Sequence, residues 1–359
     1  MRHYKIIDFY ITRKFLGTFF YSIALIISIA TVFDISENLD EFISKDIPTN
    51  DIFFDYYLNF IPYFANLFSG LFTFIAVIYF TSKMAYNSEI IAILSSGVSY
   101  RRLMRPYMVS AAIIAVFTFV MGNYIIPEAN EVRVNFRNKY INQGRVPTER
   151  NIHRQIEPGV YIYMYAFTNG AIGQKFTLER FEEGQLVEKL TADNIRWDAE
   201  RERWIINTWW KRTFHDGYET ITNGYQMDTT LNMTPAEFKM ELDLMETLTT
   251  PELNAELASM KMRGVNYVSY AIEKHKRFAG PFSAFILTII GVSLASRKIK
   301  GGLGLHLGLG LLLSFSYILF QQIAVVFSIN GNVPPVIAVW IPNLLYAIIA
   351  LFLYKWAAR

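Results

Sequence analysis

The residue types that most often carry catalysis are sparse in this sequence and form no catalytic pattern. The chain has no cysteine, which excludes thiol nucleophiles, disulfides and cysteine-bound metals. Its five histidines do not show an HExxH motif or another spacing typical of zinc ligands, and no Gly-x-Ser-x-Gly elbow is present. We therefore expect no catalytic residues, no metal site and no cofactor site in this chain.

The glycine-rich stretch Gly301–Gly310 is the nearest approach to a phosphate-binding loop. No Gly-Lys-Ser/Thr follows it, and neither a preceding strand nor a dinucleotide-binding unit is expected there. Gly304 and Gly308 instead have the Gly-xxx-Gly spacing that lets two membrane helices approach closely. The stretch predicts helix packing, and we expect that the chain does not itself hydrolyse ATP.

The segment Asn87–Pro106 contains residue types that are typical of a short helix in contact with a partner protein or with lipid. Ser88 or Asn87 is a suitable helix cap, and a carboxylate at Glu89 is favoured by the helix dipole. Gly97 would end the helix. The pattern predicts a short amphipathic helix that either lies in the groove of a soluble partner or rests on lipid. Its apolar face, at i, i+3 and i+4, consists of Ile90, Ile93 and Leu94.

The elements that must position this segment are membrane helices. Of the 359 residues 52% are hydrophobic and only 18% charged, against about 25% charged in soluble domains. Six stretches lack Asp, Glu, Lys and Arg and are long enough to cross a bilayer, which takes about 20 helical residues. They are Phe15–Phe33, Tyr56–Phe80, Pro106–Pro127, Phe278–Ser296, Leu303–Ile329 and Val336–Tyr354.

The distribution of charge predicts the orientation of the six spans. Basic residues gather at both ends of the chain, in 83–105 and in 297–300, whereas the connection Asp34–Asp55 is acidic. Short basic loops stay cytoplasmic, so both termini should face the cytoplasm and Glu128–Arg277 should lie outside. The first span has no cleavage site after it and is expected to act as an uncleaved anchor. A net charge of +3 is too small to indicate nucleic-acid binding.

The long external segment is expected to be a β domain between two polar helices, Glu128–Tyr140 and Pro251–Arg277. In Val160–Phe167 aliphatic and aromatic residues alternate, so Val160, Ile162 and Met164 share one face. Such a strand either lies in the core of a sandwich or open barrel or lines an apolar groove that binds lipid. Four further strands are expected: Lys175–Phe181, Leu186–Thr191, Trp204–Phe214 and Tyr218–Thr229.

Several segments in this order match a known family. They are Ile7-Asp8-Phe9-Tyr10-Ile11, Asn87–Arg102, Pro127-Glu-Ala-Asn130, the Trp197–Trp204 hairpin with Ile205–Arg212, and Asn332-Val-Pro-Pro335 with Ile341-Pro342. Over essentially its whole length the chain resembles the LptF/LptG (YjgP/YjgQ) permeases of the lipopolysaccharide export ABC transporter.

The resemblance implies the partners and the location. A second LptF/LptG-type permease would complete the membrane part, a dimeric LptB-type ATPase would bind ATP and Mg below it, and an LptC/LptA-type bridge would receive lipopolysaccharide in the periplasm. The multi-pass chain would lie in the bacterial inner membrane with its large domain in the periplasm. The short helix would be the coupling helix, with Glu89 as the acid that meets a basic residue of the ATPase. The coupling residues are then Ser88, Glu89, Ile90, Ile93, Leu94 and Gly97.

Lipid would enter an aromatic-rich cavity bordered mainly by the first and fifth spans of each permease. Each aromatic side chain there has an alternative role in helix packing or against membrane lipid. Asp34 replaces a basic residue that some family members carry at the outer mouth of the first span, which puts phosphate contact there in doubt. Alternative anion contacts, if not a solvated helix face, are Lys261, Arg263, Lys274, Lys276 and Arg277. The cavity candidates are Phe33, Asp34, Phe60, Phe64, Phe68, Phe315, Leu319 and Gln322.

The sequence thus predicts a polytopic α-helical membrane protein of six spans with an inserted, jellyroll-like all-β domain. Residues 1–140 would hold spans one to three and the coupling helix near 87–97, residues 141–250 the β domain, and residues 251–359 a linking helix and spans four to six. The predicted function is that of a permease passing lipopolysaccharide through its β domain to the bridge. A non-transporting mechanotransmission or envelope-assembly subunit is the alternative.

Overall fold

The computed structural model describes residues 6–141, 150–168, 171–215, 217–235, 244–262, 266–297 and 302–358. These form two compact units, a helical unit (1–136, 246–253 and 268–359) and a β unit (137–245 and 254–267). The chain therefore enters and leaves the β unit twice, whereas the predicted single insertion over 141–250 would require this only once.

The helices follow the apolar runs of the sequence, and most of them extend beyond the runs at one end or both. In the described part of the chain three short π-helical turns interrupt the α-helices, and the last of them belongs to the β unit. Their bounds are α1 (Ile6–Ser44), α2 (Thr49–Asp51), η1 (Ile52–Tyr57), α3 (Leu58–Leu67), α4 (Ser69–Tyr86), α5 (Glu89–Ser95), α6 (Tyr100–Val120), η2 (Met121–Ile125), α7 (Ile126–Phe136), η3 (Arg137–Ile141), α8 (Leu244–Thr247), α9 (Thr250–Met262), α10 (Val268–Ala295), α11 (Gly302–Ile329) and α12 (Pro335–Ala357).

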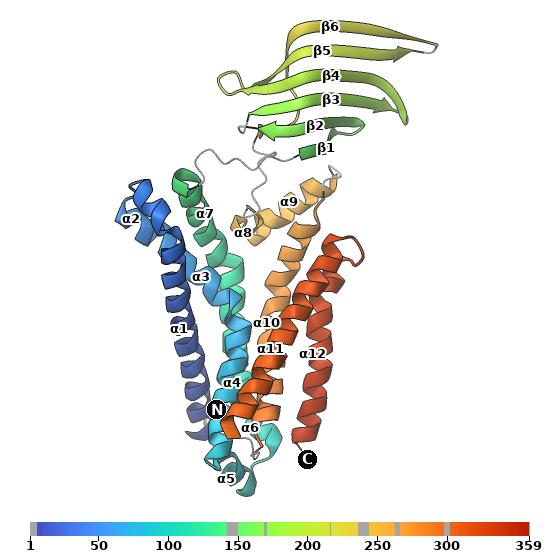
Figure 1. Ribbon diagram of the computed structural model, residues 1–359. Coiled ribbons are helices and arrows are strands. Elements are labelled where there is room, and N and C mark those ends of the chain that lie inside the picture. The colour runs from blue at the N-terminus through green and yellow to red at the C-terminus, as the bar shows by residue number, and fades with distance from the viewer. Residues whose placement is uncertain are drawn as a thin grey trace. The chain divides into compact units, whose positions relative to one another are not determined.

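Among the described residues, five helical runs are long and apolar enough to cross a membrane, and the bent pair 49–67 and 69–86 makes six if it is one span. The prediction of a polytopic helical membrane protein is confirmed. Figure 1 shows the start of α1 and the end of α12 at the same end of the helical unit, as an even number of spans requires.

The second span is not the continuous helix that Tyr56–Phe80 predicts. Its two parts, 49–67 and 69–86, meet at an angle of 60° around Phe68. The Ser69 hydroxyl donates to the Asn66 carbonyl oxygen at 2.7 Å, and Thr73 donates to the Ser69 carbonyl at 2.7 Å. Hydroxyls that bond the backbone in this way compete with the helical ladder and bend it.

The core of the helical unit is apolar and closely packed. Phe15 and Phe19 of α1, Phe74 of α4, Tyr107 of α6 and Leu287 of α10 belong to one buried cluster. The helices around it therefore bury their apolar stripes against one another as well as against lipid.

Two glycines of the core allow α4 to pack closely, but they are not those that the sequence predicts. A Cβ added at Gly291 would overlap Val77, and one at Gly310 would overlap Ile78. At Gly304 and Gly308 an added Cβ would meet no described atom within 4 Å. The Gly-xxx-Gly pair is exposed on the single chain because it lies on a different face of α11 from Gly310.

The polar helices that flank the insertion are present. The third span continues through η2 and α7 into η3, as predicted over Glu128–Tyr140. The predicted helix Pro251–Arg277 is two helices, α9 and the first turns of α10, with Pro251 in the first turn of α9. α9 begins in the helical unit, and its later turns belong to the β unit.

The β unit contains one six-stranded antiparallel sheet in which each strand pairs with the next along the chain. This confirms an inserted β domain; its described strands form a single meander rather than two stacked sheets. Its apolar cluster includes Met164, Phe176 and Trp204, and the Trp204 indole Nε1 donates to the Met233 carbonyl at 3.0 Å. The strands are β1 (Arg150–Glu157), β2 (Val160–Thr168), β3 (Ile172–Glu182), β4 (Gln185–Asp198), β5 (Arg203–His215) and β6 (Tyr218–Thr229).

Candidate functional site

The short helix α5 lies at the end of the helical unit where α1 begins and α12 ends (Figure 1). Gly97 has a φ of +87° and its N–H donates to the Leu94 carbonyl at 3.1 Å, so the prediction that it ends the helix is confirmed. The predicted side-chain cap is wrong. Ser88 precedes the helix with a φ of 63° and makes no capping bond, because a cap normally uses extended backbone to reach the amides of the first turn.

The predicted apolar face of α5 packs on the protein's own core. Ile90 is fully buried, and Ile93 and Leu94 are half-buried against the same cluster. The surface that α5 presents outward is instead formed by Ile91 and Ala92 with the first and last polar residues of the helix. The helix is therefore held rigidly from behind while its outer face is exposed.

The carboxylate of Glu89 is positioned by two side chains. The Tyr10 hydroxyl of α1 donates to Glu89 Oε2 at 3.3 Å, and Asn87 Nδ2 donates to Oε1 at 3.2 Å. Glu89 itself stays partly exposed at the start of α5. This arrangement presents an oriented acid to the surface, which suits contact with a basic group of another protein.

Behind α5, α1 and α6 are joined by a bidentate ion pair. The Arg102 guanidinium donates from Nη1 to Asp8 Oδ1 at 2.7 Å and from Nη2 to Oδ2 at 2.6 Å. Asp8 is buried, and both residues line a small pocket with Ile93 of α5. Two of the segments that carry the family resemblance are Ile7–Ile11 and Asn87–Arg102. The ion pair between Asp8 and Arg102 brings them into contact.

A second feature of the helical unit is a cavity of about 260 Å³ toward the other end of the spans, with polar and apolar side chains in its wall. It is bounded by α3, α4, α6, η2, α7, α10 and α11, together with Glu246 of α8. The hydroxyl of Ser314, which is buried in its wall, has no hydrogen-bond partner among the described residues. Polar and charged residues of the wall include Tyr63, Asn66, Glu246, Glu273, Lys276, Arg277, Ser314, Tyr317 and Gln321.

The family model described as "Lipopolysaccharide export system permease LptF/LptG" matches residues 9–356, nearly the whole chain. The chain belongs to this family. A direct comparison with curated proteins found no match. Members are transport subunits rather than enzymes, so the chain is a multi-pass membrane permease of lipopolysaccharide export.

None of the eight residues predicted to face lipid is among those that line the cavity of this LptF/LptG-family permease. Phe60 is buried and stacks on Phe64 at 3.9 Å between ring centroids, and Phe64 contacts Phe68. Phe33, Phe315, Leu319 and Gln322 are exposed on the single chain. The cavity lies within one chain, whereas the predicted lipid cavity lies between two, so the assignment of these residues stays a prediction.

Asp34 of the permease is bound by two phenols of η1. The Tyr56 hydroxyl donates to Asp34 Oδ1 at 3.3 Å and the Tyr57 hydroxyl to Oδ2 at 3.1 Å. The acid at this position therefore ties α1 to the start of the second span, a structural role that a basic residue could not fill with the same partners.

The β-domain candidates Val160, Ile162 and Met164 lie in the apolar cluster of the sheet and are almost fully buried. The side chains of Tyr161 and Tyr165 on the opposite face are exposed. Of the two roles that the alternation of β2 allows, the core role describes this structure. Lipid binding at these three residues stays a prediction and requires the cluster to open.

Sequence reasoning missed the partners of the coupling helix and most of the cavity wall of the permease. Tyr10, Asp8 and Arg102 lie in segments that resemble the family. The sequence alone does not show why a tyrosine, an acid and a base are needed at these positions. Arg277 was considered as an anion contact or as part of a solvated helix face, although it is buried and paired. Arg263 lies outside the described residues. Across the described ranges, no group of three or more His, Asp or Glu side chains could hold a metal ion.

Proposed function

We propose that this chain is one of two permease subunits of an ABC transporter in the bacterial inner membrane. The transporter extracts lipopolysaccharide and passes it, through the periplasmic β domain, to an LptC/LptA-type bridge toward the outer membrane. A separate LptB-type ATPase dimer binds ATP and Mg and supplies the energy. Family membership supports the cargo, and the geometry of α5 supports the coupling.

The observation that carries the coupling role is the way Glu89 is held. Tyr10 and Asn87 orient its carboxylate, while Ile90 fixes α5 to the core. An ATPase that grips the outer face of α5 therefore acts on the helix and on α1 together. The motion reaches the spans because the apolar core between them is closely packed.

The exposed apolar faces of α1 and α11 support a lipid cavity shared with a second permease. Phe33 of α1 and Phe315 and Leu319 of α11 project from the single chain. Burial of acyl chains against such side chains is favourable by about 25 cal/mol per Å². Closing the two permeases would reduce that surface and push the cargo outward.

Replacing Glu89 by alanine tests the coupling. Loss of a charge-assisted contact of about 1.5–3 kcal/mol should weaken ATPase binding by about 10–100-fold. Co-purification and ATP-dependent lipopolysaccharide release from proteoliposomes measure the effect. Glu37→Ala, an exposed acid farther along α1, is the matched control and should retain both.

If Glu89→Ala binds the ATPase and exports as well as the control, the coupling assignment is wrong. If depletion of the chain leaves lipopolysaccharide at the outer surface unchanged, the transport role is wrong and the scaffold alternative gains support.

A further inference from the structure

The segment Glu246–Leu253 belongs to the helical unit although the chain before and after it belongs to the β unit. It contains the end of α8 and the first turn of α9. The chain therefore returns from the β unit, docks among the spans for a short stretch, and leaves again along α9. A return of this kind needs specific contacts to outweigh the entropy of ordering the segment.

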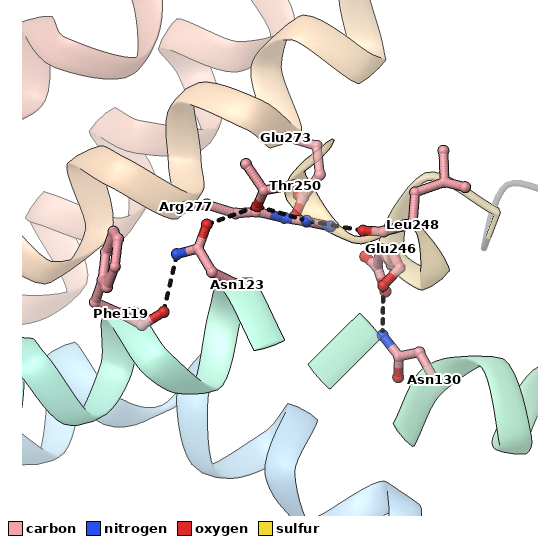
Figure 2. Close-up of polar contacts among 8 residues, drawn as sticks. All are labelled: Phe119, Asn123, Asn130, Glu246, Leu248, Thr250, Glu273 and Arg277. Atoms are coloured by element: carbon pink, nitrogen blue, oxygen red, sulfur yellow. Dashed lines mark hydrogen bonds and ion pairs between the residues drawn. The ribbon is translucent and has the colours of Figure 1, made fainter. Parts of the chain in front are cut away.

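Figure 2 shows these contacts, which come from two different spans. Arg277 of α10 donates from Nη1 to the Leu248 carbonyl at 2.8 Å, and the same nitrogen lies 3.4 Å from Thr250 Oγ1. Thr250 in turn donates to Asn123 Oδ1 of η2 at 2.7 Å. Asn130 Nδ2 of α7 lies 3.4 Å from the Glu246 carbonyl.

The groups that make these contacts are buried and held in place. Arg277 is 6% exposed, Asn123 4% and Asn130 1%. Asn123 Nδ2 donates to the Phe119 carbonyl at 2.9 Å, and Arg277 Nε donates to Glu273 Oε1 at 3.1 Å. Polar groups so far from water are costly unless their partners stay in place, so the contacts favour one fixed position of the segment.

The docked segment also starts α9 with a side-chain contact between Thr249 and Glu252. The Thr249 N–H and hydroxyl donate to Glu252 Oε2 at 2.8 and 2.7 Å, which lowers the pKa of the Glu252 carboxyl. Leu253, one turn on, is fully buried. The start of α9 is thereby fixed within the helical unit at Thr249–Leu253.

The same cluster borders the cavity between the spans. Glu246, Glu273 and Arg277 line it, together with Gly122 of η2. The docked segment is thus part of the wall between the third and fourth spans, at the place where the third span contains a π-helical turn.

We propose that Asn123, Thr250 and Arg277 are positioning residues that form a fixed latch, which holds the start of α9 to the third and fourth spans throughout transport. The latch keeps the β domain anchored so that it receives cargo released by the spans. This inference rests on the proposed export function.

The natural absence of cysteine makes the latch testable with an engineered pair, Asn123→Cys with Thr250→Cys. In the reduced state the hydrogen bond between the two side chains is lost. With the permease reconstituted with its partner permease and ATPase, we expect ATP-dependent release of lipopolysaccharide to a soluble bridge protein to fall about fivefold, the equivalent of one hydrogen bond of about 1 kcal/mol. ATPase co-purification and photo-crosslinking of lipopolysaccharide from position 319 should stay unchanged.

Closing the cysteine pair with a disulfide, or with the shortest bis-methanethiosulfonate reagent, should restore release to within twofold of wild type. Wild-type release by the reduced pair would show that the latch is not needed. Loss of release on closure would show that the segment must undock. Either result overturns the proposal, whereas failure of the wild-type chain to load or release lipopolysaccharide contradicts the export function instead.

If the double variant does not insert, Arg277→Lys replaces it, because lysine keeps the charge but loses the planar fork. Release should fall with ATPase binding retained, while Ser269→Ala, at an exposed position near the start of α10, should leave both at wild-type levels. Equal release by Arg277→Lys and Ser269→Ala overturns the latch.

Discussion

Replacing Asp8 by asparagine removes one charge from the bidentate pair that joins α1 to α6 behind the coupling helix. The two hydrogen bonds are 2.6 and 2.7 Å long, and the side chains of Arg102 and Asp8 are 27% and 12% exposed. Breaking a fully buried pair costs about 3–5 kcal/mol. Because a quarter of Arg102 still reaches solvent, we expect a loss of about 2–3 kcal/mol.

A double-mutant cycle in mixed micelles measures this energy. Asp8→Asn, Arg102→Gln and the double variant are unfolded by titration with a denaturing detergent, and the coupling energy is taken from the four free energies of unfolding. The expected coupling is about 2 kcal/mol. The pair Lys189–Glu179 on the β sheet has a similar distance of 2.7 Å, but its side chains are 36% and 32% exposed. It should give less than about 1 kcal/mol.

Coupling of less than about 0.5 kcal/mol between Asp8 and Arg102, within the usual error of additivity, would refute the reasoning. So would equal coupling for the two pairs, since the Asp8–Arg102 pair is both more buried and bidentate.

Three further changes test the packing and the latch. Gly291→Ala should destabilise the helical unit by about 1–3 kcal/mol, measured in the same titration, because its Cβ would overlap Val77; Gly308→Ala, with no described atom within 4 Å, is the control. Trp204→Phe should cost about 1–3 kcal/mol, measured by thermal unfolding of the full chain, because the buried Met233 carbonyl loses its donor. The lowered pKa of Glu252 means that its contribution is present above the ordinary carboxyl pKa of about 4.3 and is lost as the pH falls through the folded value. Amide exchange at Leu253 should therefore be faster in Glu252→Gln than in wild type at neutral pH, and the difference should disappear in acid; a difference that persists there would contradict the capping role.

The spans and most strands could be predicted because their signals are local. Uncharged apolar runs indicate helices α1, α6, α10, α11 and α12, and alternation indicates β2. β1 was missed because Arg150–Glu157 is mostly polar, and only Ile152 and Ile156 are apolar and buried. That strand forms because its backbone pairs with β2, which its own side chains do not reveal.

The candidate site was less predictable because its contacts are distant in sequence. Tyr10 and Glu89 are 79 residues apart, and Asn123 and Thr250 are 127 apart. Periodicity placed Ile90 on an apolar face correctly, but it could not show that this face packs on the protein's own core instead of on a partner. Single-sequence patterns report which face is apolar, not what covers it.

One helical run links the two polar clusters of the helical unit. Tyr100–Ile141 is continuous through α6, η2, α7 and η3 and carries Arg102 near its start and Asn123 and Asn130 farther along. At 1.5 Å per residue, Arg102 and Asn130 are about 40 Å apart along this run. The ion pair that fixes α1 beside the coupling helix and the latch that holds the start of α9 thus belong to one helical run, and its π-helical turn η2 contains Asn123. A closely packed interior transmits displacement instead of absorbing it. Displacement of α5 by an ATPase and anchoring of the start of α9 would therefore both act on this helical run.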